Sequence, residues 1–235
     1  MSMAIHTIIM DNQTPLIRLF SWLSPAFPIG GFAYSQGLET AIADGRIRDQ
    51  DHLADWIGGQ LHRGGLRTDA YFLAIAARAV TNGNWTALSE ANELCLALQI
   101  SAERDKEMRE QGHSFVQAAS AWPIPMADAL SAAFKNPMAL PVAFGAMAGL
   151  HGVLPGAAIA GFVNSAVAQQ ISVGVRLIPL GQTAGLAIQA ALEPRIAKLA
   201  TRAISAGLDD ISALSYGTEI ASLKHEDLDV RIFRS

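Results

Sequence analysis

The stretch NPMALPVAFGAMAGLHGVLPGAAIAGFVNSAVAQQISVGV, residues 136–175, contains no Asp, Glu, Lys or Arg. A membrane-spanning helix needs about 20 predominantly apolar residues, so the stretch is long enough to raise that interpretation. However, Pro141 and Pro155 interrupt it, and it is richer in Ala and Gly than in Leu and Ile. It also contains the polar side chains of His151 and Asn164. The pattern favours the buried centre of a helical domain over a membrane span.

The composition of the whole chain agrees with a folded domain in a reducing compartment. Of the 235 residues, 51% are hydrophobic and only 16% are charged, which allows a sizeable core in one large domain or two small ones. The net charge of −4 argues against a nucleic-acid-binding protein. Cys95 is the single cysteine, which excludes a disulfide framework and a thiolate metal cluster. The first residues lack the pattern of a secretion signal, so we expect a cytoplasmic protein.

Helical periodicity continues on both sides of the uncharged stretch. Thr14-Pro15 is a typical helix start, and apolar residues then recur with helical spacing up to Leu23. The same criteria predict helices over 35–44 and 51–64, from Thr68, over 84–119 and 137–150, from Pro155, and as a pair meeting near Pro194. Ser35 and Thr68 are the expected N-caps.

No run of alternating apolar and polar residues indicates a strand. The sequence therefore predicts an all-α, single-domain bundle of about ten helices. We divide it into a flexible N-terminal segment (1–13), the helical domain (14–222) and a C-terminal docking tail (223–235).

A rigid bend is expected at SPAFPIGGFAYSQGLE, residues 24–39. Pro25 and Pro28 fix φ near −65°, and Gly30-Gly31 permit backbone angles that other residues resist. No lysine follows the glycines, so the segment is not a phosphate-binding P-loop. The sequence AYSQG is one residue away from the nucleophile elbow of hydrolases, which leaves a small serine hydrolase using Ser35 as the alternative function.

Other signs of catalysis are missing from the sequence. No two of the six histidines stand three or four residues apart, so we expect no metal site in this chain. The run ERDKEMRE, residues 103–110, has only one uncharged residue. It is interpreted first as a solvated helix face and second as a charged patch for a partner. These features favour a binding protein over an enzyme.

The ending LKHEDLDVRIFRS, residues 223–235, is too charged to form core. One interpretation is a frayed terminus. The other is a docking peptide with Phe233 as anchor, mobile after about Lys224 in the free protein and ordered on binding. On that second interpretation, removing the last twelve residues abolishes complex formation but leaves the melting temperature nearly unchanged.

Three segments together resemble the UreF family of urease accessory proteins. They are the bend at 24–39, VRLIPLGQTAGLAIQAALEP at 175–194, and HEDLDVRIFRS at 225–235. The resemblance implies an all-helical, dimerising scaffold for nickel insertion into urease, not an enzyme. It also implies that the scaffold binds UreD (called UreH in some organisms), recruits the GTPase UreG and docks on apo-urease. No cofactor is expected to bind tightly, because nickel is handled by the assembled complex.

The resemblance and the residue chemistry together give two sets of candidate site residues. The expected partner-binding residues are Tyr34, Gln36, Glu39, Arg176, Gln182, His225, Glu226, Arg231, Phe233 and Arg234. The expected structural residues of the motifs are Pro25, Pro28, Gly30, Gly31, Gly37, Pro179 and Gly181. If the chain stimulates GTP hydrolysis, the candidate arginine fingers are Arg104, Arg109 and Arg234, all expected to be exposed.

Arg176 is the only charged residue between Asn136 and Glu193. Burying it alone would be costly, so we expect it to have a carboxylate partner or to reach solvent. An ion pair with Glu39 is the specific hypothesis.

Overall fold

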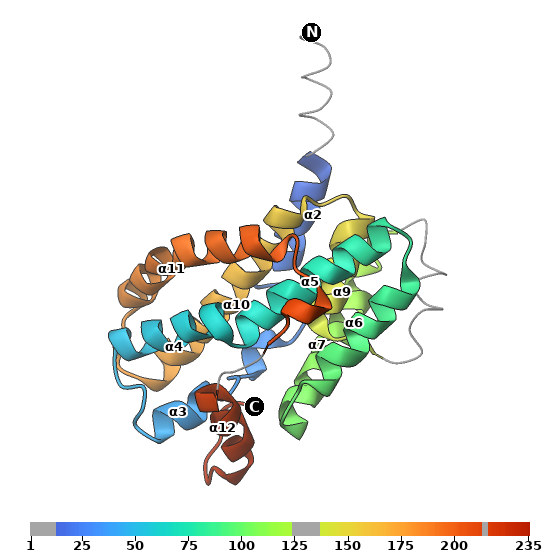
Figure 1. Cartoon of the computed structure of the whole chain (residues 1–235). Coiled ribbons are helices and arrows are strands. Elements are labelled where there is room, and N and C mark those ends of the chain that lie inside the picture. The colour runs from blue at the N-terminus through green and yellow to red at the C-terminus, as the bar shows by residue number, and fades with distance from the viewer. Residues whose placement is uncertain (1–12, 124–136, 213–215) are drawn as a thin grey trace.

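The computed structural model describes residues 13–123, 137–212 and 216–235. Within these ranges every regular element is helical, which confirms the all-α prediction (Figure 1). The predicted N-terminal segment lies outside the described residues except for Gln13, with which α2 (Gln13–Leu23) begins.

The core of the bundle is the contact between α5 (Gly65–Thr81) and α9 (Leu140–Leu150). The α9 helix comes from the uncharged stretch and is buried along most of its length. Its glycines allow the two backbones to approach, because a Cβ at Gly145 would collide with the Leu73 carbonyl oxygen. The helix is therefore close-packed protein interior, as the sequence indicated.

The second half of the uncharged stretch forms α10 (Pro155–Leu177). Among the described helices, α10 alone is long and apolar enough to cross a membrane, but half of the relevant window is buried. It packs lengthwise against α11 (Gln182–Ala203), which also contacts α4 (Gln50–Arg63) (Figure 1). These contacts are those of a core helix in a helical bundle.

Several predicted helix boundaries are wrong. Ser35 is not the N-cap of the helix expected over 35–44, because that helix is Leu38–Ala43 and its N-cap is Gly37. The helix expected over 84–119 is two helices, α6 (Trp85–Ala97) and α7 (Ala102–Ala119), because the Ser101 side chain caps α7 by accepting from the Arg104 amide. Thr68 is not an N-cap, since α5 begins at Gly65 and the Thr68 hydroxyl donates to a carbonyl of the preceding turn. Pro194 lies inside a continuous α11.

The bend at 24–39 forms a short 3₁₀ turn, η1 (Gly31–Ala33), followed by α3 (Leu38–Ala43). The chain turns before η1 at Gly30 and before α3 at Gln36 and Gly37, and all three residues have positive φ angles. After α11 come a second 3₁₀ turn, η2 (Leu208–Asp210), and then α12 (Tyr216–Lys224) and η3 (His225–Asp227). The α12 helix packs on α3, which brings the C-terminal segment back to the bend.

Candidate functional site

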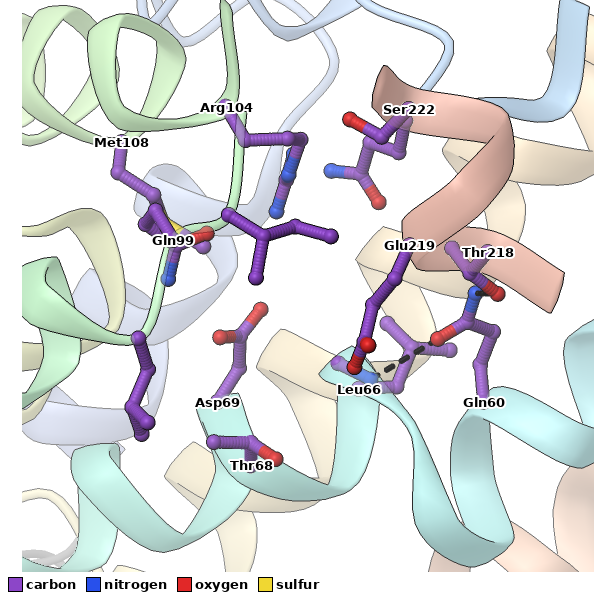
Figure 2. A pocket seen from close by; sticks show the side chains of 14 residues that line it. Gln60, Leu66, Thr68, Asp69, Gln99, Arg104, Met108, Thr218, Glu219 and Ser222 are labelled. Atoms are coloured by element: carbon purple, nitrogen blue, oxygen red, sulfur yellow. Dashed lines mark hydrogen bonds between the residues drawn. The ribbon is translucent and has the colours of Figure 1, made fainter. Parts of the chain in front are cut away.

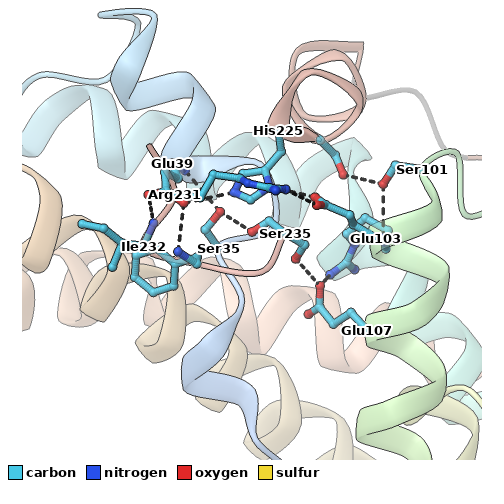
Figure 3. Close-up of polar contacts among 12 residues, drawn as sticks. Ser35, Glu39, Ser101, Glu103, Glu107, His225, Arg231, Ile232 and Ser235 are labelled. Carbon is cyan, nitrogen blue, oxygen red and sulfur yellow. Dashed lines mark hydrogen bonds and ion pairs between the residues drawn. The ribbon is translucent and has the colours of Figure 1, made fainter. Parts of the chain in front are cut away.

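The C-terminal segment lies in a site that we call the tail cradle, formed by residues 33–39 and by Glu103, Glu107 and Glu110 of α7. Two backbone hydrogen bonds join the segments: the Arg234 amide donates to the Ala33 carbonyl (2.8 Å) and the Ser35 amide donates to the Ser235 carbonyl (2.6 Å). The Ser35 hydroxyl donates to the same Ser235 carbonyl. The bend and the tail, about 200 residues apart in sequence, are thus directly paired (Figure 3).

Glu39 is the centre of the tail cradle and is 6% exposed. Its carboxylate accepts from the backbone amides of Ile232 (2.8 Å) and Phe233 (3.1 Å), and from the His225 Nε2 (3.0 Å). A buried carboxylate is stable only when its oxygens are satisfied, and here the tail supplies these three donors. The fold of the tail and the charge of Glu39 therefore depend on each other.

His225 is completely buried and bridges two carboxylates (Figure 3). Its Nδ1 lies 2.7 Å from Glu103 and its Nε2 contacts Glu39. A ring that is protonated at both nitrogens donates to both carboxylates at once. Arg231 donates to the other oxygen of Glu103 at 2.9 Å. Two basic groups of the tail thus face two acidic groups of the body.

Glu107 binds the end of the tail and is 1% exposed. It accepts from the Ser235 hydroxyl at 2.8 Å and from the Gln36 side chain at 3.0 Å, and it forms an ion pair with Arg104. Gln170 of α10 in turn donates to Gln36 at 3.1 Å. This network connects the tail and the bend to two helices of the bundle.

Glu110, Tyr34 and Arg234 form the outer edge of the tail cradle. The Tyr34 hydroxyl donates to Glu110 at 2.6 Å, and the Arg234 guanidinium pairs with Glu110 at 3.0 Å and lies over the Tyr34 ring. Burial and the hydrogen bond to Glu110 raise the pKa of Tyr34, so its hydroxyl remains a donor. The hydrogen bond from Tyr34 and the charge of Arg234 lower the pKa of Glu110.

Phe233 anchors the tail in the core, with 4% of its surface exposed. The Arg176 guanidinium lies 5.8 Å from the centroid of the Phe233 ring and 5.8 Å from that of Phe32. Arg176 itself is exposed. Of the two expected outcomes, a carboxylate partner or access to solvent, the structure shows access to solvent. The predicted ion pair with Glu39 is wrong, because Glu39 is engaged by His225 and the tail amides instead.

A pocket of about 90 Å³ lies next to the tail cradle, between α5, α7 and α12. Asp69 and Arg104 project into it from opposite sides, with Glu219 and Ser222 of α12 along a third (Figure 2). Burial, together with the charge of Glu107, raises the pKa of Asp69 to about 7, although Arg104 opposes the shift. No group of three or more His, Cys, Asp or Glu side chains that could hold a metal ion occurs among the residues that the structure describes.

The expectation that the tail is loose after Lys224 is contradicted, since His225, Phe233 and Ser235 are all buried. The sequence suggested a solvated segment because charged residues dominate it. In the structure those charges meet the carboxylates of α7 and α3 instead. Whether the tail also docks a partner stays a prediction.

The other predicted site residues divide by exposure. Glu226 and Gln182 are exposed, and Gln182 lies at the start of α11, directly after its N-cap Gly181. Pro25 and Pro179 are exposed at their turns, whereas Gly31 is buried against Gln169. Pro28 lies in the bend before η1. A role for Glu226 and Gln182 in partner binding stays a prediction, as does the structural role expected for the prolines and glycines of the motifs.

Ser35 and the candidate arginine fingers are occupied by contacts within the chain. The Ser35 hydroxyl is buried and donates to the Ser235 carbonyl, so the serine hydrolase alternative has no support. Arg104 pairs with Glu107, Arg109 with Asp105 and Arg234 with Glu110. Arg104 is largely buried, which contradicts its expected exposure.

The sequence reasoning missed Glu103, Glu107 and Glu110 as site residues. Their spacing of i, i+4 and i+7 places all three on one face of a helix, and that signal was available in ERDKEMRE. A helix face with three acids on one side and a C-terminal segment with His225, Arg231 and Arg234 are complementary in charge.

Gly37 lies where the bend packs closely against α12. A Cβ at Gly37 would lie 2.9 Å from the Ser222 amide nitrogen and 3.1 Å from the Thr218 carbonyl oxygen, and φ is +78°. Gly45 has a similar φ of +70° but open space around it. We expect Gly37→Ala to lower the free energy of unfolding by about 2 kcal/mol more than Gly45→Ala does. Urea denaturation of both variants measures the difference, and equal losses would contradict the packing of α12 on the bend.

Comparisons with known proteins agree on one family. A sequence model described as UreF matches residues 47–193. The chain is 44% identical to a urease accessory protein UreF from Allorhizobium ampelinum, over 97% of this chain and 100% of that protein. It is 43% identical to a protein of the same name from Bradyrhizobium diazoefficiens (94% and 91% covered), and 44% identical to one from Rhizobium leguminosarum bv. viciae (94% and 96% covered).

Proposed function

The chain belongs to the UreF family of urease accessory proteins, and we propose that it is a scaffold for the insertion of nickel into apo-urease. It works with other urease maturation factors and is not itself an enzyme. In this proposal the chain binds UreD (or UreH) through the surface around the tail cradle. The assembled pair then recruits the GTPase UreG in the cytoplasm. Nickel is handled by that assembly and does not bind tightly to this chain.

The observation that supports the proposal is an exposed apolar surface presented by the cradled segment. Tyr216, Ile220 and Leu223 of α12 are spaced at i, i+4 and i+7, which places them on one helix face, and each is 47–69% exposed. On the tail, Val230 is 80% exposed and Ile232 is 67% exposed. Exposed apolar side chains gathered on one element are typical of a protein-binding surface.

The tail cradle explains how such a surface is held ready for a partner. The His225 and Phe233 contacts fix the tail from inside, so Val230 and Ile232 are left facing outward. A surface that is ordered before binding loses less conformational entropy when the partner docks. The cradle therefore supports a binding role for the tail without requiring that the tail fold on binding.

The second prediction tests this surface. We expect Ile220→Ser/Leu223→Ser to weaken the binding of UreD by about tenfold or more, because two exposed apolar contacts are lost. The free energy of unfolding should hardly change, since both side chains are exposed in the free chain. Co-purification and titration with UreD measure binding, followed by a nickel-dependent urease activation assay.

Leu186→Ser is the matched control, because Leu186 is 71% exposed but lies on α11. It should leave UreD binding and urease activation unchanged. Wild-type UreD affinity in the double variant would show that α12 is not the docking surface. Full urease activation when this chain is omitted would contradict the proposed function as a whole.

UreG recruitment and dimerisation complete the proposal. A helical scaffold that dimerises presents two copies of each surface, which suits the assembly of several maturation factors. Control of GTP hydrolysis is proposed to act through the conformation of UreG, because Arg104, Arg109 and Arg234 already pair with carboxylates of this chain.

A further inference from the structure

A basic groove lies between α4 and α11. None of its lining residues belongs to the tail cradle. Its volume is about 610 Å³. Its lining residues are Gly58, Gly59, Leu61, His62, Arg67, Arg195, Lys198, Leu199 and Arg202. The lining thus contains four Lys or Arg and no carboxylate, in a chain whose net charge is −4. A cleft lined by charges of one sign concentrates the field and attracts ions of the opposite sign.

Three of the cations project from one face of α11. Arg195, Lys198 and Arg202 are spaced at i, i+3 and i+7 and are exposed. In the described part of the chain, none of the three has a carboxylate within ion-pair distance, whereas Arg104, Arg109, Arg231 and Arg234 all have one. Cations on one helix face repel each other, so the cluster is unfavourable for folding without an anion.

Arg67 of α5 adds a fixed guanidinium to the groove and is 8% exposed. Its Nη2 donates to the Ser212 carbonyl at 3.0 Å and to the Ser212 hydroxyl at 2.7 Å. Its Nε has no hydrogen-bond partner among the described residues. A buried donor without an acceptor costs about 1–3 kcal/mol, so the hydrogen bonds of this guanidinium are only partly satisfied within the described chain.

Gly58 shapes the opposite wall of the groove. A Cβ added there would collide with the Arg195 Nη1, so the absence of a side chain lets this guanidinium lie across α4. At the neighbouring Gly59 a Cβ would meet nothing within 4 Å. The position of Arg195 therefore depends on Gly58 and not on Gly59.

We propose that this groove binds the phosphate chain of a di- or triphosphate, a role that goes beyond the proposed scaffold function. Guanidinium groups match phosphate oxygens in pairs, and three of the four strong cations here are arginines. Arg195 and Arg202 are seven residues apart, or about 10 Å along the helix, which suits a phosphate chain better than a single phosphate. The volume falls within the range of small-molecule sites.

The test is calorimetric titration of the full chain at constant ionic strength, with inorganic triphosphate in one arm and ATP in the other. We expect saturable binding of at least one of the two. Arg195→Gln/Arg202→Gln should weaken it at least tenfold, whereas Arg48→Gln/Lys106→Gln, which removes two exposed cations outside the groove lining, should leave it within twofold. Equal affinity for the two anions identifies the phosphate chain as the recognised group, and tighter ATP binding adds a contribution from the nucleoside.

Two glycine variants test whether the position of Arg195 matters for binding, without changing the charge of the groove. Gly58→Ala should weaken the same binding about tenfold by displacing Arg195, and Gly59→Ala should not weaken it. A poly-glutamate peptide serves as the third titrant. The proposal is wrong if neither phosphate compound saturates the groove, if only the peptide does, or if the double arginine variant binds as the wild type does.

Discussion

Deletion of residues 225–235 is expected to lower the free energy of unfolding by about 4 kcal/mol, or the melting temperature by about 10 °C. The deletion exposes the pocket of Phe233 and removes the donors that satisfy Glu39. It also leaves Glu39 and Glu103 without the His225 ring that lies between them, so both carboxylates lose a buried hydrogen-bond partner. The charged composition of the tail suggested the opposite result, a melting temperature that hardly changes.

Thermal unfolding monitored by circular dichroism measures this effect. Val230→Ser/Ile232→Ser is the matched control, because both side chains are exposed and the cradle contacts remain. It should melt within about 2 °C of the wild type while losing affinity for UreD. An unchanged melting temperature in the deletion would show that the tail does not occupy the cradle in the free protein.

Replacement of Glu39 by Ala is expected to have an effect of similar size from a single side chain. Removing the acceptor of a buried hydrogen bond costs about 1–3 kcal/mol for each donor that is left buried and unsatisfied. Here the unpaired groups are the His225 ring and the amides of Ile232 and Phe233. The variant should therefore release the tail as well as lose stability.

Hydrogen exchange at the Ile232 and Phe233 amides reports the release of the tail directly. We expect protection of both amides to be lost in Glu39→Ala and retained in Glu226→Ala, which removes an exposed carboxylate of the same segment. Urease activation should follow the same order, since a released tail no longer presents Val230 and Ile232. Protected amides in the Glu39 variant would show that other contacts hold the tail.

The apolar pattern of the sequence was sufficient to determine the fold class and most of the helices. The uncharged stretch became α9 and most of α10, because helical segments without charged residues can be buried along much of their surface. The boundaries at Ser101 and Pro194 were not determined in this way. Whether a polar side chain caps a helix, or a proline is tolerated inside one, depends on the packing around it.

The resemblance to the UreF family, carried by the bend, the segment 175–194 and the tail motif, also came from the sequence alone. Tyr34, Glu39, His225 and Phe233 were predicted from the sequence as contacts for a partner, and that role stays a prediction. Only the tertiary structure showed that Glu39 accepts hydrogen bonds from His225 and the Phe233 amide, and that Tyr34 donates to Glu110.

The physical reason is that a charged residue in a sequence does not by itself indicate whether its side chain is exposed or buried. Glu103 and Arg231 are typical of solvated segments when each is considered alone, because burying either one unpaired is unfavourable. Their pairing becomes favourable once a fold brings the opposite charges within hydrogen-bond distance across more than a hundred residues, and Glu103 can then be largely buried while Arg231 stays exposed. Apolar periodicity is a local property and can be read from the chain, whereas the pairing of distant charges exists only after the chain has folded.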